Sequence, residues 1–572
     1  MEEALRSRGL GPGQDPRDIG PAYLVNFGTP QPAFRLGEFT SAAEYLDIDY
    51  CFVPLHINAP AAASSMPDEA AQAAAEPASQ LGMNPSRPFM LVHLPSDDAA
   101  QRLADRATSI RSIWAHWVTA PSLAQACEAL QHDPGVRSRW TPYRPDHISW
   151  RATVWAHFRT LFPAEQLERI EAFASTLDFL GPIRMKAPDM EWGYFEEWTR
   201  PVHVAATAEE LASSATYVVE NGWSGRDDND DGDDVAAPRQ RLLAVHVARK
   251  VTDGRARHLI AAMDVKQRAY IGNTTMEAHM SLVQAVMALA GPGKIVYDPF
   301  AGTGSLLYAA AKMGAYVVAS DIDARMMKGK VNAKDGSTGI MRSARQYGVQ
   351  HLVLDCLACD MTQHPWRFGG LFDAIVADPP YGIRAGAKRL GRRDESKQRT
   401  EAFLMPDGTY SHQRPDYVPP SKPYPLDDLI ADLLRLSATL LKPRGRLVFW
   451  VPTMTEGSSG EDTYQQQPVQ LPPSQDFRLV SHAMQDFGTW GRRLITLEKL
   501  DAEQRAARQQ GDETAAIGSF EAPSGHMAAA ASKQAEPPPQ KEPLKEGKVR
   551  ADADPNEFRN KYFGRKQQTS HA

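Results

Sequence analysis

Short apolar runs alternate with helix-like stretches between residues 270 and 454. The runs are continuous, and they lie at 294–300, 315–321, 352–360, 372–380 and 445–452. Continuous apolar strands are expected where helices cover both faces of a sheet. The pattern therefore predicts an α/β domain over residues 259–500, built on a doubly wound, mostly parallel sheet whose last strand is 493–500.

The N-terminal part of the chain shows a weaker periodicity. Residues 22–147 combine short apolar strands, such as 22–27 and 87–95, with helical spacing, which indicates an α+β domain. In residues 148–258, apolar and polar positions alternate as in half-buried strands, and a helical pattern begins at Pro163. We expect a second small α/β unit there, of a kind that often carries RNA.

Several segments have compositions that are typical of loops or disorder. They are the N-terminus (1–21), an Ala/Ser/Pro-rich insert (57–86), an acidic insert (225–238), a Gly/Ser/Gln/Pro-rich insert (453–475) and most of the tail (501–572), which carries a terminal FRNKYF patch. The acidic insert contains six aspartates at 227–234, and these account for most of the net charge of −7. A nucleic-acid footprint must therefore be sought locally.

The chain carries no signal for secretion or membrane insertion. It lacks a run of about 18 apolar residues, and its N-terminus has acidic residues but no apolar segment. Four cysteines are too few for a disulfide framework, which indicates a reducing compartment and predicts a cytoplasmic protein. Cys356 and Cys359 form a lone CxxC pair, which we interpret as ordinary buried cysteines, and we predict no metal site.

A glycine-containing loop, DPFAGTG, links the first strand of the predicted parallel sheet to a helix. Gly302 and Gly304 permit a sharp turn and a close ligand approach, and ligands of such sheets bind at the carboxyl ends of strands. Asp298 suits a cationic ligand such as S-adenosylmethionine, and Asp321 can accept hydrogen bonds from ribose hydroxyls. Asp360 is a candidate acceptor for an adenine amino group. The alternatives are a purely structural turn and, for Asp360, a loop cap.

The sequence DPPY, at residues 378–381, ends a later strand and carries the most specific chemistry. An exocyclic base amine is a poor nucleophile because its lone pair is delocalised into the ring. Asp378 can accept one N–H and the following backbone carbonyl the other, which aims the lone pair at a methyl carbon. Pro379 and Pro380 hold that carbonyl, and Tyr381 offers a stacking face. Orientation and charge stabilisation supply the catalysis, without a metal.

The stretch after DPPY is basic. Residues 382–399 contain seven Lys and Arg side chains and two acids. A basic segment beside a base pocket predicts phosphate contacts, with a solvated charged loop as the alternative. The candidate RNA-binding residues are Arg384, Lys388, Arg389, Arg392 and Arg393.

These motifs resemble one eukaryotic family closely. The segments YIGNTT (270–275), VYDPFAGTGSLLYAAAKMGAYVVASDID and DPPYGIRAG are similar to the catalytic subunit of the tRNA guanine N2-methyltransferase that acts at position 10. The N-terminal segments LVNF, FRLGEF, ISWRATVWAHF and LDFLGPIRMKAPDMEW look like that family's N-terminal and THUMP domains, and FRNKYF looks like its C-terminus. The resemblance spans roughly residues 22–500, and the inserts depart from the compact family pattern.

The resemblance implies a Rossmann-like methyltransferase domain that uses S-adenosylmethionine, a THUMP domain that binds tRNA, and a small zinc-binding activator subunit as partner. It also implies that Asn273 and Thr274 lie beside the cofactor. The predicted cofactor-binding residues are Asn273, Thr274, Asp298, Phe300, Gly302, Gly304, Asp321, Ile322 and Asp360.

Methylation of the exocyclic N2 of a guanine in tRNA is the function we predict. Two alternatives remain at this point. DPPY suits any exocyclic amine, so a DNA adenine N6-methyltransferase is one, although no DNA-reading motif is evident. The other is a catalytically silent RNA-binding scaffold. The sequence argues against it, because every expected catalytic position is occupied.

Overall fold

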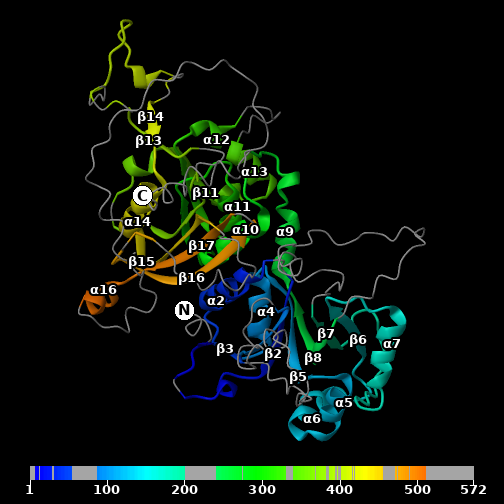
Figure 1. Ribbon diagram of the computed structural model, residues 1–572. Helices are drawn as coiled ribbons and strands as arrows, with labels where there is room; N and C mark the ends of the chain where they lie inside the picture. Colours follow the sequence, from blue (N-terminus) through cyan, green and yellow to red (C-terminus); the bar gives the residue numbers. More distant parts are fainter. Residues whose placement is uncertain are drawn as a thin grey trace, which may run out of the picture. The chain divides into compact units, whose positions relative to one another are not determined.

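The structure is a computed structural model. It describes residues 7–11, 13–28, 31–53, 87–199, 240–272, 275–329, 339–367, 369–381, 386–392, 394, 396, 401–414, 417, 419–454, 471–472, 474–487 and 490–509. The chain divides into two compact units, and the division falls between Ala262 and Met263. We refer to them as the N-terminal and C-terminal units, and each contains its own large sheet (Figure 1).

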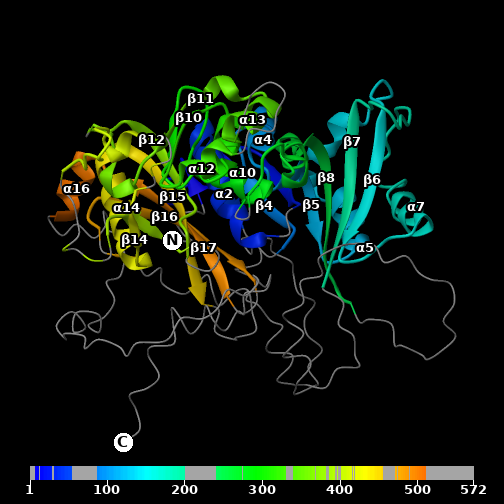
Figure 2. The same cartoon turned by 90° about the horizontal axis from the view of Figure 1, so that it is seen from above.

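An eight-stranded sheet forms the N-terminal unit, in the order β1-β3-β4-β2-β5-β8-β7-β6. Its strands are β1 (Ser7–Arg8), β2 (Ala22–Phe27), β3 (Tyr50–Val53), β4 (Phe89–His93), β5 (Ile110–Ala120), β6 (Trp150–His157), β7 (Met190–Trp198) and β8 (Leu242–Asp253). Its helices are α2 (Arg35–Leu46), α4 (Asp97–Arg106), α5 (Leu123–His132), α6 (Pro134–Trp140), α7 (Pro163–Ala172) and α9 (His258–Ala262). Figure 2 shows β6, β7 and β8 side by side, with α7 next to β6.

The domain boundary predicted between residues 147 and 148 does not coincide with a break in this sheet. β5 pairs with β2 on one side and with β8 on the other. Its backbone therefore joins the two segments that we expected to fold separately. The sequence pattern did not reveal β5, because its buried and exposed positions do not alternate regularly.

Two segments predicted to be disordered contain ordered elements. Residues 7–8 form β1, which pairs with β3, and Arg8 forms ion pairs with Asp47 and Asp49. At the other end, α16 (Ala502–Gln509) follows the last strand, and its Arg508 donates a hydrogen bond to the backbone oxygen of Phe477. Of the other predicted loops, residues 57–86 and 225–238 lie outside the described residues, as does the FRNKYF patch.

A seven-stranded sheet forms the C-terminal unit, in the order β11-β10-β9-β12-β15-β17-β16. Its strands are β9 (Ile295–Asp298), β10 (Tyr316–Asp321), β11 (Val353–Ala358), β12 (Phe372–Ala377), β15 (Leu441–Met454), β16 (Phe477–Asp486) and β17 (Trp490–Lys499). Its helices besides α16 are α10 (Ala278–Met287), α11 (Ser305–Lys312), α12 (Ala324–Lys328), α13 (Gly339–Gln346) and α14 (Leu426–Leu440), and β13 (Lys388–Leu390) pairs with β14 (Ser421–Pro423).

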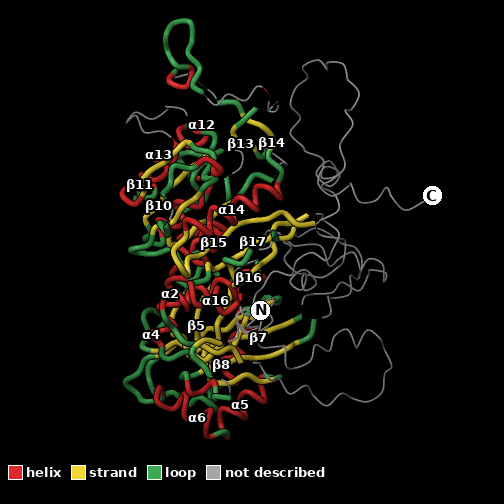
Figure 3. The backbone as a smooth tube through the Cα atoms, turned by 90° about the vertical axis from the view of Figure 1, so that its left-hand side faces the viewer, coloured by secondary structure: helices red, strands yellow, loops and turns green. Residues whose placement is uncertain are grey.

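The five strands from β11 to β15 are parallel to their neighbours, whereas β17 runs antiparallel to both β15 and β16. This confirms the predicted α/β class with a mostly parallel, doubly wound sheet. The predicted last strand corresponds to β17, which lies between β15 and β16 in the sheet (Figure 3). β16, whose sequence FRLVSHAMQD mixes apolar and polar residues, was not predicted.

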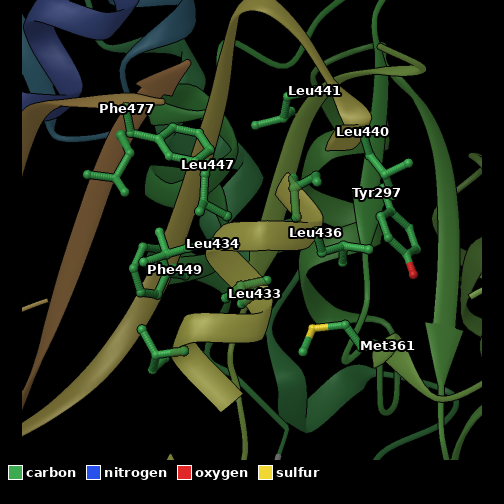
Figure 4. Close-up of a cluster of buried hydrophobic side chains, with 14 of the residues drawn as sticks. Tyr297, Met361, Leu433, Leu434, Leu436, Leu440, Leu441, Leu447, Phe449 and Phe477 are labelled. Atoms are coloured by element: carbon green, nitrogen blue, oxygen red, sulfur yellow. The ribbon is translucent and has the colours of Figure 1, made fainter. Parts of the chain in front are cut away.

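Helix α14 covers one face of the sheet with a leucine stripe. Leu433, Leu436 and Leu440 follow the three- and four-residue spacing of one helix face, and all are buried. Figure 4 shows these side chains facing Leu447 and Tyr297 from the strands. Each fully buried leucine contributes about 1.5–3 kcal/mol to stability. The stripe thus supports β9, β12 and β15, and the carboxyl ends of β9 and β12 carry two residues of the site described below.

Candidate functional site

Three aspartates come together at the carboxyl ends of neighbouring parallel strands. Asp298 is the last residue of β9, Asp321 is the last residue of β10, and Asp378 follows β12 directly. β9 lies between β10 and β12, so Asp298 lies between the other two. The strand order therefore unites the glycine-loop motif and DPPY, which the sequence separates by 80 residues (378 − 298).

The glycine loop is held by the same carboxylates. Gly302 and Gly304 adopt left-handed backbone, with φ of +50° and +88°. A Cβ atom at Gly304 would lie 2.8 Å from the hydroxyl oxygen of Tyr308, so only glycine fits there without displacement. The Phe300 N–H donates to Asp298 over 2.9 Å, and the Gly302 N–H donates to Asp321 over 2.9 Å.

Asp298 and Asp321 are placed where ionisation is costly. Burial raises the pKa of Asp298 well above its usual value. The hydrogen bond from the Phe300 N–H lowers this pKa, and the negative charges of Asp321 and Asp378 raise it. Burial also raises the pKa of Asp321, which the N–H groups of Asp323 and Gly302 partly offset. Each Asp321 oxygen accepts one backbone N–H, which leaves a lone pair on each for a further donor. A cationic ligand would relieve this accumulation of buried negative charge.

Asp378 has two partners within the C-terminal unit. The Tyr381 hydroxyl donates to its Oδ1, and Nη1 of Arg492 lies 3.8 Å from its Oδ2. Burial raises the pKa of Asp378, whereas the Arg492 charge and the Tyr381 hydroxyl lower it, and the net direction is upward. Pro379 is buried and Pro380 half-buried, as a rigid support behind the carboxylate requires.

Arg492 was absent from the sequence prediction. It lies near the start of β17, and β17 runs antiparallel to a strand that is itself parallel to β12. The beginning of β17 therefore reaches the edge of the sheet at which β12 ends. The sequence motifs do not indicate this residue. Arg492 lies beside DPPY because β17 runs in the opposite direction to the parallel strands.

Other predicted cofactor residues have mixed placements. Asp360 is buried, and its carboxylate accepts from the Thr362 N–H at 2.8 Å and from the Leu390 N–H at 2.5 Å. These bonds correspond to the loop cap that the sequence left open as an alternative. Phe300 and Ile322 are half-buried beside the glycine loop and Asp321. Asn273 and Thr274 lie outside the described residues.

The basic segment after DPPY lies partly on β13. Lys388 is exposed, Arg392 is half-buried, and the Arg389 guanidinium lies 5.2 Å from the ring centroid of Tyr424. The hydrogen bond from the Leu390 N–H to Asp360 holds β13 close to the loop that follows β11. Arg384 and Arg393 lie outside the described residues.

The described residues contain no cluster of His, Cys, Asp and Glu suited to a metal ion. Cys356 and Cys359 are free thiols that are partly accessible, where we had expected them to be buried. Cys356 lies on β11, and among the described strands β11 is the outermost of its sheet, with a neighbouring strand on one side. Among the described helices, none combines the length and apolar character that crossing a membrane requires.

Comparison with known proteins gives matches in both units. Residues 78–218 match the family model "Tmrp11 THUMP N-terminal domain", and residues 266–393 match "RMKL-like, methyltransferase domain". A human protein, "tRNA (guanine(10)-N(2))-methyltransferase TRMT11", is 30% identical over 72% of this chain and 80% of its own length. The Saccharomyces cerevisiae "tRNA (guanine(10)-N(2))-methyltransferase" is 31% identical over 71% of this chain and 83% of its own length.

The chain belongs to the tRNA (guanine(10)-N(2))-methyltransferase family. The resemblance inferred from the sequence motifs is thereby confirmed. The THUMP N-terminal match crosses residue 147, as does the single sheet of the N-terminal unit. Among solved structures, TrmN from Thermus thermophilus is similar over 84% of this chain and all of its own, with 15% identity and a TM-score of 0.34. The fold class rests on the strand order given above.

Proposed function

We propose that this protein transfers a methyl group from S-adenosylmethionine to the exocyclic N2 of a guanine in tRNA, at position 10 as in its relatives' names. One observation carries the proposal: Asp378 of DPPY lies at the same sheet edge as the buried Asp298 and the half-buried Asp321. A carboxylate suited to an amine is thus adjacent to carboxylates suited to a cation.

The residues at the glycine loop fit S-adenosylmethionine. The position that a Cβ of Gly302 would take is open space beside the loop, and Asp298 is a buried acid that favours a positively charged neighbour. Asp321 would accept hydrogen bonds from ribose hydroxyls with its remaining lone pairs. When bound, the cofactor supplies a methyl group on a positively charged sulfur.

Asp378 would orient the base. It accepts one N–H of the guanine amine, while the backbone carbonyl before the second proline accepts the other and leaves the nitrogen lone pair directed at the methyl group. The methyl carbon would bond to the nitrogen as its bond to sulfur breaks, and the electron pair of that bond would stay on the sulfur, which becomes neutral. The nitrogen would become positive, and Asp378 would stabilise that charge, accept the proton that the nitrogen loses and pass it to solvent. In the structure the Tyr381 hydroxyl donates a hydrogen bond to Oδ1 of Asp378. When the base binds, Tyr381 would break this hydrogen bond and stack on the base.

Recognition of tRNA would involve both units. Lys388, Arg389 and Arg392 would contact phosphates near the base pocket, and phosphate contacts supply affinity without sequence selectivity. The residues that match the THUMP N-terminal model would hold the remainder of the tRNA.

A small zinc-binding activator is the partner that we propose, acting in the cytoplasm. The edge strand β11 supports a docking surface on the C-terminal unit, since Leu354 is 53% exposed there. Free strand edges and exposed apolar side chains favour pairing with another chain. Co-purification of the tagged chain with a small zinc protein would support this partner, and Leu354→Lys should weaken the complex.

Methyl transfer from labelled S-adenosylmethionine to unmodified tRNA tests the proposed activity. We expect wild type to label tRNA, Asp378→Ala to lose at least about a hundredfold in rate, and the exposed Asp428→Ala to behave as wild type. Equal labelling by wild type and Asp378→Ala would overturn the proposal. Labelling of duplex DNA instead of tRNA would favour the adenine N6 alternative.

A further inference from the structure

Arg492 occupies a position that the proposed reaction has not yet used. Its guanidinium is within ion-pair distance of Asp378, and the Arg492 side chain is 13% exposed. It comes from β17, more than a hundred residues after DPPY in the sequence. A positive charge at this distance favours the ionised form of the Asp378 carboxylate, which is the proposed base-binding group.

The guanidinium is fixed from two directions. Its Nε donates to Oε1 of Gln485 over 2.8 Å, and it lies 4.2 Å from the ring centroid of Trp450. Gln485 is held in turn by Glu277, to which it donates over 3.0 Å. These contacts leave Nη1 directed at Asp378 and make the arginine a defined part of the site.

Hydrogen bonds through Gln284 connect Trp450, whose ring contacts Arg492, to the backbone next to Asp378. Trp450 donates from Nε1 to Oε1 of the buried Gln284 over 2.9 Å. The amide nitrogen of Gln284 donates to the backbone oxygens of Val448 at 2.8 Å and Ala377 at 3.3 Å. Ala377 directly precedes Asp378, so one buried network positions both the carboxylate and its cation.

The charge on Asp378 determines which base edge it matches. Guanine presents two neighbouring donors, N1–H and N2–H, and a carboxylate presents two acceptors. Adenine presents a donor, N6–H, beside the acceptor N1, which a neutral carboxylic acid would match with its own O–H. Burial favours the neutral acid, and the positive charge of Arg492 favours the carboxylate.

We propose that Arg492 is a positioning residue that keeps Asp378 as an oriented carboxylate and thereby makes the pocket selective for guanine over adenine. This inference rests on the proposed function, because it assigns the base selectivity of that same site. Arg492 acts through Asp378 and takes no part in bond making.

The test compares Arg492→Met, Arg492→Lys and a control, Arg478→Met, in the full chain with its activator. Arg478 also lies in the sheet of the C-terminal unit, on β16, and pairs with Glu498 at 2.8 Å. The initial rate of methyl transfer to unmodified tRNA is measured as a function of pH. Calorimetric titration with S-adenosylmethionine confirms that each variant is folded.

We expect Arg492→Met to lose about tenfold or more in kcat/KM near pH 6, because it removes a unit charge about 4 Å from the carboxylate. Its activity should recover as the pH rises, since hydroxide then removes the proton that Arg492 no longer disfavours. Arg492→Lys retains the charge, so its pH profile should follow wild type at a reduced rate. Arg478→Met should follow wild type throughout.

A second readout uses tRNA with adenine in place of the target guanine. The ratio of adenine to guanine methylation should rise about tenfold in Arg492→Met, which is within the range expected for a mismatched base edge. A pH profile of Arg492→Met parallel to wild type, or an unchanged ratio, overturns the inference. If the Met variant does not bind cofactor, a shifted profile in Arg492→Lys overturns it, and an unshifted one supports it.

The two proposals fail in different ways. If wild type methylates tRNA and Asp378→Ala does not, while Arg492→Met retains the wild-type profile, the proposed function stands and only the role of Arg492 is lost. If wild type methylates no guanine in tRNA, both are lost.

Discussion

Gln284 offers a direct test of how the fold supports the site. This amide on α10 is fully buried, and it joins Trp450 to the end of β12 and to the middle of β15. Gln284→Leu has a similar volume but can neither donate nor accept. The substitution therefore isolates the polar contacts from the packing.

The magnitude follows from the bonds that are lost. The Trp450 N–H loses its acceptor in a buried position, which costs about 1–3 kcal/mol. The carbonyl oxygens of Val448 and Ala377 each lose a bond worth about 0.5–1.5 kcal/mol. We expect the C-terminal unit to be destabilised by about 2–6 kcal/mol, with a slower methyl transfer because the backbone before Asp378 is less constrained.

Hydrogen exchange followed by mass spectrometry on the full chain measures this locally. The opening free energy of peptides that cover β12 and β15 should fall in Gln284→Leu. Ser281→Ala is the matched control on the same helix, since its hydroxyl donates to the backbone oxygen of Glu277 over 2.9 Å, within the same helix turn. An opening free energy within about 0.5 kcal/mol of wild type, together with normal activity, would show that Gln284 does not tether the site.

Three further predictions concern single carboxylates. Asp321→Ala should weaken S-adenosylmethionine binding at least about tenfold by calorimetry, because it removes the acceptor proposed for the ribose hydroxyls, and unchanged affinity would refute that role. Asp298 has a raised pKa, so binding of the cationic cofactor should lower that pKa and release a proton at pH values where the free protein holds it; heats of binding in two buffers of different ionisation enthalpy measure this release, which Asp298→Asn should abolish. In the N-terminal unit, burial raises the pKa of Glu197, but His246 and Arg87 hold it at about 2, below the usual 4.5, so the stability from its ionised form is present above about pH 4.5 and is lost as the pH falls toward 2. Hydrogen exchange in β7 and β8 should show about 3 kcal/mol of this acid-dependent loss, and Glu197→Gln should lack it; the same slope in both proteins would contradict the assignment.

The sequence predicted those parts of the site that depend on local chain direction. Asp298, Asp321 and Asp378 each end a continuous apolar strand, and parallel strands deliver their ends to one edge. The sequence also predicted the sharp turn at Gly302 and Gly304, because few residues other than glycine tolerate left-handed backbone. For these residues, local pattern and fold class together were sufficient.

Other features depend on contacts between distant segments. Arg492 reaches Asp378 only because β17 reverses direction, and Gln284 reaches Ala377 only through helix packing on the sheet. Asp360 has the position expected of a cofactor acceptor, but backbone N–H groups use its carboxylate. The joining of residues 22–147 and 148–258 into one sheet follows from the pairing of β5 with β8, which sequence periodicity alone does not specify.

The most direct test is to identify the methylated nucleoside. Unmodified tRNA is incubated with the full chain, the proposed activator and S-adenosylmethionine, then digested and analysed by mass spectrometry with position mapping. We predict N2-methylguanosine at position 10 with wild type and none with Asp378→Ala. A methyl group found on adenine or cytosine, or equal N2-methylguanosine from Asp378→Ala, would contradict the assignment of Asp378 as the residue that orients the guanine amine.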